Sequence, residues 1–130
     1  MSTGRKNPAG RLIWFEIPAD NVERARKFYK SLFGWKINKF PGGTDYWHID
    51  TGADASPDGG LHALMRPEQT ITQYVAVPSV TRFIAKVKKL GGKVSVPKTA
   101  VPQMGYFAIC QDTENNVFAL WERNEKAKQA

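Results

Sequence analysis

The sequence has few of the residues on which covalent crosslinks and metal sites depend. Its 130 residues include one cysteine, Cys110, and two histidines, His48 and His62. A single cysteine cannot close a disulfide within the chain, and a cysteine-based zinc site would need partners that the sequence does not have. Cys110 ends the apolar run 106–110, so we interpret it as a small core residue rather than a nucleophile.

Long apolar runs are absent as well. No uninterrupted apolar stretch approaches the roughly 20 residues that span a bilayer. Residues 1–11 are polar and basic, without the apolar core of a signal peptide. We therefore expect a protein of the cytoplasm that has no membrane segment. A hydrophobic content of 42% over 130 residues is typical of one compact globular domain.

Acidic residues are in the minority. The chain has 19 lysines and arginines against 12 acidic residues, which gives a formal net charge of +7. Such an excess raises the hypothesis of a nucleic-acid partner. The basic residues are, however, spread over both tails and two helix-like stretches, as on an ordinary solvated surface. We therefore do not expect nucleic-acid binding, and a basic module that binds acidic partners remains an alternative.

The chain contains an internal repeat, in which Trp14 corresponds to Thr72 and Glu16 to Tyr74. Each copy starts with a strand-like run, at 12–17 and at 72–77, and continues into a helical pattern. Asp20 with Glu23 predicts a capping box for the first helix and Gly34 its end, while Ser79 predicts the cap of the second. The apolar stripes of the two helices are Val22, Ala25, Tyr29 and Leu32, and Val80, Phe83, Val87 and Leu90.

Three short strands are expected after each helix, at 35–40, 45–50 and 60–66, and at 93–96, 105–111 and 117–122. The pairs Gly59–Gly60 and Gly91–Gly92 are interpreted as turn or cap glycines. The pattern therefore predicts an α+β domain over 1–130, made of two βαβββ modules at about 11–67 and 70–123 with short polar tails. Each module alone would expose one sheet face, so we expect the two to pair.

Several motifs together resemble the vicinal oxygen chelate superfamily, which includes glyoxalases, extradiol dioxygenases, and bleomycin- and fosfomycin-resistance proteins. The resemblance runs from about Arg11 to Arg123. It implies paired βαβββ modules whose eight strands curl into a cup around a small-molecule ligand, commonly in a homodimer. The residues that carry it are 14–20, 24–29, 32–35, 59–61, 90–92, 104–108 and 112–120.

The resemblance also implies a divalent metal held by the first and last strands of each module. The matching positions here are Trp14, Thr72 and Ala119. An indole nitrogen only donates, a methyl group has no lone pair, and a lone neutral hydroxyl is a poor ligand. We therefore expect no metal and no other cofactor. A non-standard metal site would need His48 and His62 to converge with a carboxylate, Glu16 or Asp50.

Strand alternation predicts which side chains line the cup. On the first strand Ile13, Phe15 and Ile17 should face the helix, while Trp14 and Glu16 face the ligand. A carboxylate on an otherwise apolar inner face needs a partner, and Glu16 is the candidate catalytic residue. The candidate ligand-binding residues are Trp14, His48, Thr72, Tyr74, Ala119 and Trp121.

These observations leave three hypotheses open. The first is a metal-independent protein that binds a small aromatic or cationic molecule, similar to the drug-sequestering resistance proteins. The second is a glyoxalase-like lyase, isomerase or dioxygenase that uses Glu16 as a general base or a non-standard metal site. The third is the basic interaction module. In the first hypothesis the large indole of Trp14 fills the volume that the metal would occupy.

Overall fold

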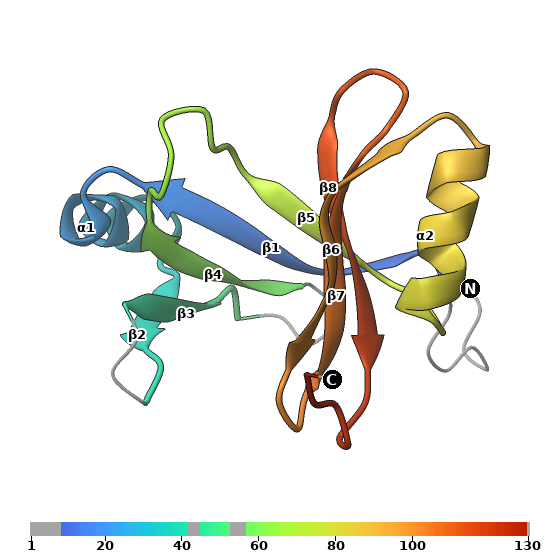
Figure 1. The fold of residues 1–130 in the computed structure, drawn as a ribbon. Helices are drawn as coiled ribbons and strands as arrows, with labels where there is room; N and C mark the ends of the chain where they lie inside the picture. The colour runs from blue at the N-terminus through green and yellow to red at the C-terminus, as the bar shows by residue number, and fades with distance from the viewer. Residues whose placement is uncertain (1–8, 42–44, 53–56, 130) are drawn as a thin grey trace, which may run out of the picture. The chain divides into compact units, whose positions relative to one another are not determined.

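The computed structural model describes residues 9–41, 45–52 and 57–129, so most of the predicted N-terminal tail lies outside the described residues. Within these ranges the chain forms two βαβββ modules, which confirms the α+β fold class (Figure 1). Neither helix is long and apolar enough to cross a membrane. The elements are β1 (Arg11–Ala19), α1 (Val22–Phe33), β2 (Lys36–Lys39), β3 (Tyr46–Asp50), β4 (Asp58–Ala63), β5 (Thr72–Ala76), α2 (Val80–Lys89), β6 (Lys93–Val101), β7 (Gly105–Gln111) and β8 (Val117–Arg123).

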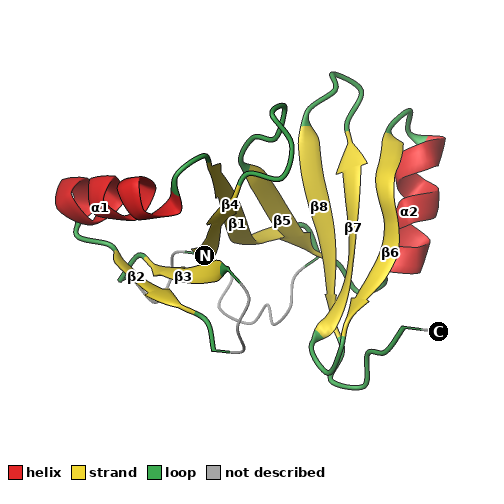
Figure 2. Ribbon diagram, turned by 60° about the vertical axis from the view of Figure 1, so that its left-hand side comes forward, coloured by secondary structure: helices red, strands yellow, loops and turns green. Residues whose placement is uncertain are grey.

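The chain divides into two compact units. The α1 unit is Ile13–Thr72, and the α2 unit is Gln73–Ala130 together with the described residues before Ile13. In the α1 unit the strand order is β2-β3-β4-β1, with β1 and β4 parallel and the other pairs antiparallel. In the α2 unit the order is β5-β8-β7-β6, with β5 and β8 parallel (Figure 2). Each unit thus repeats the same strand topology.

Helix α1 begins one residue later than the sequence predicts. Its N-cap is Asn21, whose side chain accepts a hydrogen bond of 2.9 Å from the backbone N–H of Arg24. The predicted capping box of Asp20 with Glu23 is wrong because pairing of β1 with β4 continues to Ala19 and delays the turn. The helix ends at Gly34, as predicted, where φ is 74° and only glycine is free of strain.

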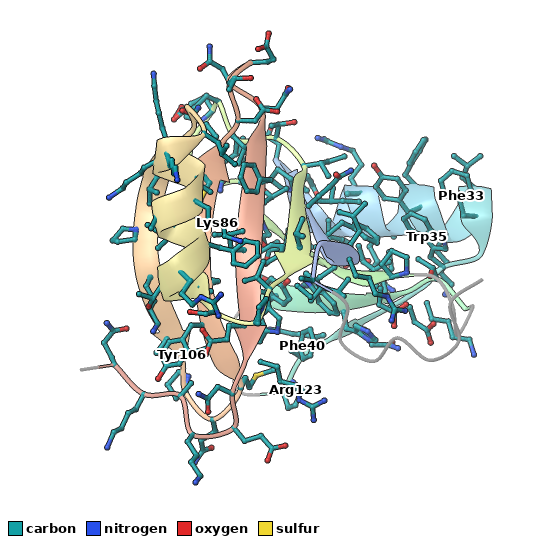
Figure 3. All side chains as sticks on the ribbon, turned by 90° about the vertical axis from the view of Figure 1, so that its right-hand side faces the viewer. Phe33, Trp35, Phe40, Lys86, Tyr106 and Arg123 are labelled. Atoms are coloured by element: carbon teal, nitrogen blue, oxygen red, sulfur yellow. The ribbon has the colours of Figure 1, made fainter. Side chains whose placement is uncertain are left out.

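One face of the α1 unit's strands carries its core, which is covered by α1. The helix contributes Val22, Ala25 and Tyr29 as predicted, but Leu32 is 58% exposed. At this end of the helix Trp35 takes the covering role instead, because its ring packs on Tyr29 at 5.3 Å and on Phe33 at 5.0 Å (Figure 3). The buried residues of this core are Ile17, Ala19, Ile37, Ile49 and Leu61.

Helix α2 covers the core of the second unit. Ser79 caps it as predicted, and the carboxylate of Glu122 accepts a further hydrogen bond of 2.9 Å from the backbone N–H of Val80. Leu90, predicted to lie on the apolar stripe, is 75% exposed because the helix has ended at Lys89. Cys110 is fully buried in this core. The buried residues are Val77, Val80, Ala108, Cys110 and Leu120.

Strand β6 stands at one edge of the α2 unit's strand order and is longer and less regular than predicted. Its register against β7 shifts twice, between Val94 and Val96 and again before Thr99. Lys98 bridges this strand to α2, since its ammonium donates to the Thr81 hydroxyl at 3.0 Å and lies 4.3 Å from the centre of the Tyr106 ring. The edge strand is therefore bulged and carries a lysine held in place.

Candidate functional site

The clearest departure from the sequence interpretation concerns Gly59 and Gly60. They are not turn glycines, because β4 begins at Asp58 and both lie inside the strand. Gly60 pairs with Glu16 of β1 on one side and with His48 of β3 on the other. A Cβ on Gly60 would overlap the hydroxyl of Tyr46. The glycine is therefore required by the close approach of a side chain from the neighbouring strand.

The strand face opposite α1 carries most of the predicted site residues of this unit, and we call it the Trp14 face. Alternation separates it from the core, because Phe15, Ile17, Trp47 and Ile49 pack under the helix. The residues between them point the other way and contact one another. The Trp14 face consists of Trp14, Glu16, Phe40, Tyr46, His48, Asp58, Gly60 and His62.

A chain of two hydrogen bonds crosses this face. The indole N–H of Trp14 donates to the hydroxyl of Tyr46 at 3.0 Å, and that hydroxyl donates to Oε2 of Glu16 at 2.7 Å. Burial, then the charge of Glu16 and the hydrogen bond to it, raise the pKa of Tyr46 far above its ordinary value. The phenol therefore stays protonated and fixes one oxygen of the Glu16 carboxylate. Sequence analysis did not select Tyr46.

A second polar pair lies beside this chain. Nε2 of His48 is 3.2 Å from Oδ2 of Asp58, and the other carboxylate oxygen accepts from the backbone N–H of Thr51 at 3.1 Å. The imidazole is nearly parallel to the indole of Trp14, with ring centres 5.8 Å apart and planes at 13°. Phe40 packs against the same imidazole at 5.5 Å. Asp58 was not selected from the sequence either, because it lies before the strand predicted at 60–66.

The structure brings together the predicted residues Trp14, Glu16 and His48 in the α1 unit. In the α2 unit Tyr74 pairs with Ala119, and Ala76 with Trp121, on the strand face opposite α2. Ala119 has no exposed surface. Thr72 is the first residue of β5. That Thr72, Tyr74, Ala119 and Trp121 contact a ligand stays a prediction.

The side chains at two of the three positions that the resemblance matches to metal ligands, Trp14 and Ala119, offer no lone pair to a divalent cation. Trp14 uses its only polar atom as a donor to Tyr46, and Ala119 has a methyl group. The histidines do not join in a cluster either, since Nδ1 of His62 faces the carbonyl of Ala63 at 2.9 Å. Across residues 9–41, 45–52 and 57–129 no group of three His, Cys, Asp or Glu side chains is placed to hold a metal.

Comparisons with known proteins identify the family. Residues 11–52 match the family described as bleomycin resistance protein-like N-terminal. A glyoxylase-like domain-containing protein of Didymella fabae is 33% identical over 124 residues, which cover 90% of this chain and 97% of that protein. The chain belongs to the vicinal oxygen chelate superfamily of glyoxalases, bleomycin-resistance proteins and dioxygenases. The sequence-based resemblance is confirmed.

Solved structures share the fold of this chain at low sequence identity. A glyoxalase/bleomycin resistance protein/dioxygenase superfamily member from Vibrio splendidus 12B01 matches with a TM-score of 0.64 at 11% identity, over 88% of this chain and 99% of that one. Methylmalonyl-CoA epimerase from Mycobacterium tuberculosis matches with a TM-score of 0.62 at 12% identity, over 88% of both chains.

Proposed function

We propose that the protein binds a small aromatic or cationic organic molecule on the Trp14 face, without a divalent metal in the site. The observation that carries the proposal is the Trp14–Tyr46–Glu16 chain of hydrogen bonds. The resemblance matches the position of this indole donor to a lone-pair ligand of the superfamily's metal enzymes. The indole, the phenol and the carboxylate then form a binding surface in place of a coordination sphere.

The chemistry of the Trp14 face supports this class of ligand. Aromatic rings and carboxylates lie close together on this face. The rings are those of Trp14, Phe40 and Tyr46, and the carboxylates are those of Glu16 and Asp58. An aromatic ring stacks on such surfaces, and a cation is attracted both by the ring faces and by the carboxylates. Apolar surface with a few oriented polar groups is the usual composition of a small-molecule site.

The proposal is tested by thermal shift with a panel of aromatic amines and neutral aromatic compounds, together with the metal content of the purified protein. A ligand that binds the native state raises the melting temperature. Trp14→Ala should weaken binding about fivefold or more, as loss of an aromatic anchor does. Trp47→Phe, on the helix-covered face, is the matched control and should leave binding unchanged. A stoichiometric divalent ion that only a chelator removes, or full affinity in a folded Trp14→Ala variant, would overturn the proposal.

A second candidate function is proton transfer with Glu16 as the general base. It is favoured by the 2.7 Å hydrogen bond from Tyr46, because a general base must be held in a fixed orientation. In deuterated water such an enzyme would exchange deuterium into the acidic C–H bonds of a small carbonyl compound, which mass spectrometry detects. Exchange that Glu16→Gln abolishes would support this candidate, and exchange that persists in that variant would refute it.

The proposal includes a homodimer, which is the common state of the superfamily. Light scattering over a range of concentrations measures the mass directly. Twice the mass of one 14.6 kDa chain is expected. The mass of a single chain at every concentration would contradict it.

A further inference from the structure

His48 is held in one orientation from three directions. Asp58 contacts its Nε2 at 3.2 Å, Trp14 lies nearly parallel to the ring, and Phe40 packs against it at 5.5 Å. Asp58 is on β4, Trp14 is on β1, and Phe40 is the residue that follows β2. An imidazole fixed in this way has little rotational freedom to lose when a ligand binds, which is the usual preparation of a functional side chain.

The tautomer of His48 follows from the bonds that Asp58 makes. One carboxylate oxygen accepts from the backbone N–H of Thr51 at 3.1 Å and from its hydroxyl at 3.4 Å. The other oxygen faces Nε2 of His48. An ionised carboxylate only accepts, so Nε2 carries the proton and Nδ1 of the neutral ring has the lone pair. A carboxylate that orients a histidine in this way is a common arrangement in catalytic and metal sites.

The lone pair on Nδ1 is accessible. Among the described residues Nδ1 of His48 has no hydrogen-bond partner, because the contacts of this side chain are the bond to Asp58 and the two ring contacts. No buried side-chain nitrogen or oxygen in the same residues lacks a partner, so Nδ1 cannot be a buried atom. The side chain as a whole is 36% exposed. An oriented acceptor therefore stands at the surface of the Trp14 face.

His62 provides a contrast on the same face. Its Nδ1 donates to the carbonyl of Ala63 at 2.9 Å, and Tyr46 stacks on its ring at 6.0 Å. No carboxylate among the described residues holds its other nitrogen. The two histidines therefore differ in what they present to a ligand.

We propose that Nδ1 of His48 accepts a hydrogen bond from the ligand, that Asp58 is the positioning residue that fixes the tautomer, and that the ligand is a hydroxylated aromatic compound. The aromatic part is required by the indole of Trp14 beside the imidazole, and the hydroxyl by the acceptor character of Nδ1. This assignment rests on the proposed function, and it names the class of ligand and the residue that selects it.

The experiment uses two probes that differ only in the donor, 4-methylphenol and its methyl ether. Affinities are measured by tryptophan fluorescence titration and checked by calorimetry. The wild-type protein should bind the phenol roughly fivefold more tightly, as one net hydrogen bond allows. His48→Phe keeps a ring against Trp14 and should abolish the preference while the ether still binds. Asp58→Asn should reduce the preference, because the amide can also donate and no longer fixes the tautomer. Trp47→Phe, on the helix-covered face, should preserve it.

The outcomes separate this inference from the proposed function. A fivefold preference that survives in folded His48→Phe would overturn the assignment of His48. Equal binding of the two probes by the wild-type protein would overturn it as well, while leaving aromatic binding on the Trp14 face intact. If neither the phenol nor the ether binds, the assignment of a hydroxylated aromatic ligand is overturned. The proposed function fails only if the aromatic amines and neutral aromatic compounds of the thermal-shift panel do not bind either.

Discussion

The hydroxyl of Tyr46 lies in the space that a side chain on Gly60 would need. The two residues belong to neighbouring antiparallel strands, and Gly60 is flanked by Glu16 and His48 at the same level of the sheet. The absent side chain thus makes room for the phenol of Tyr46, whose hydroxyl reaches Glu16 across Gly60. The site is organised around a residue that contributes no side chain of its own.

Gly60→Ala should therefore destabilise the protein by about 1–3 kcal/mol, the usual cost of inserting an atom into a packed position. The free energy of unfolding is measured by urea titration. In a Tyr46→Ala background the phenol is absent, so Gly60→Ala should cost much less there. An equal cost in both backgrounds would mean that the overlap with Tyr46 is relieved without strain.

Tyr46→Phe removes the link between Trp14 and Glu16. The indole N–H then loses its acceptor and the carboxylate loses one donor, which should lower the free energy of unfolding by about 1–3 kcal/mol. Tyr29→Phe is the control, because no hydrogen bond of the Tyr29 hydroxyl is present among the described residues. The interpretation fails if the two substitutions have the same effect.

The raised pKa of Tyr46 predicts a dependence of stability on alkaline pH. The unfolded phenol loses its proton near pH ~10, whereas burial first, and Glu16 second, keep the folded phenol protonated. Above that pH the unfolded state binds fewer protons than the folded state, so the free energy of unfolding falls as pH rises. Below that pH the contribution of Tyr46 to the free energy of unfolding is complete. The difference in stability between wild type and Tyr46→Phe should thus shrink above pH ~10. A constant difference would contradict the raised pKa.

Trp14→His tests whether one substitution restores the superfamily's metal site. We expect no tight binding of zinc or other divalent ions by calorimetry, because Thr72 and Ala119 still lack suitable donors and a lone imidazole falls short of the three or four ligands required. Tight stoichiometric binding by this single variant would show that further ligands were already in place.

Cys110 should be unreactive in the folded protein. It is fully buried beneath α2, and burial raises the pKa of its thiol, so that little thiolate is present at neutral pH. A chromogenic disulfide reagent should modify it only at the rate of unfolding, and at once in denaturant. Fast modification under native conditions would contradict a core position.

The sequence predicted those features that depend on near neighbours. Alternation along β1 placed Phe15 with the core and Trp14 on the other face, and Gly34 ended α1, because each signal is local. The position of Leu32 was wrong, since a ring from beyond the helix covers the core in its place.

The site itself was predicted only in part, for the same reason. Trp14, Glu16 and His48 were selected, but the partners that orient them, Tyr46 of β3 and Asp58 of β4, come from other strands, whose register the sequence alone did not reveal. Gly60 was misinterpreted because a glycine pair is the ordinary signal of a turn. The need for glycine becomes clear only when the phenol of the adjacent strand is in place.

The irregular edge of the α2 unit bears on how the protein behaves at high concentration. A regular edge strand is a template on which other chains can add strands and start aggregation. β6 shifts register twice, and it carries Lys93, Pro97 and Lys98 along its length. Bulges, prolines and lysines each interrupt the ladder that an incoming strand would need. The irregular edge strand β6 therefore protects the α2 unit, at that edge, from the addition of strands that leads to fibrils.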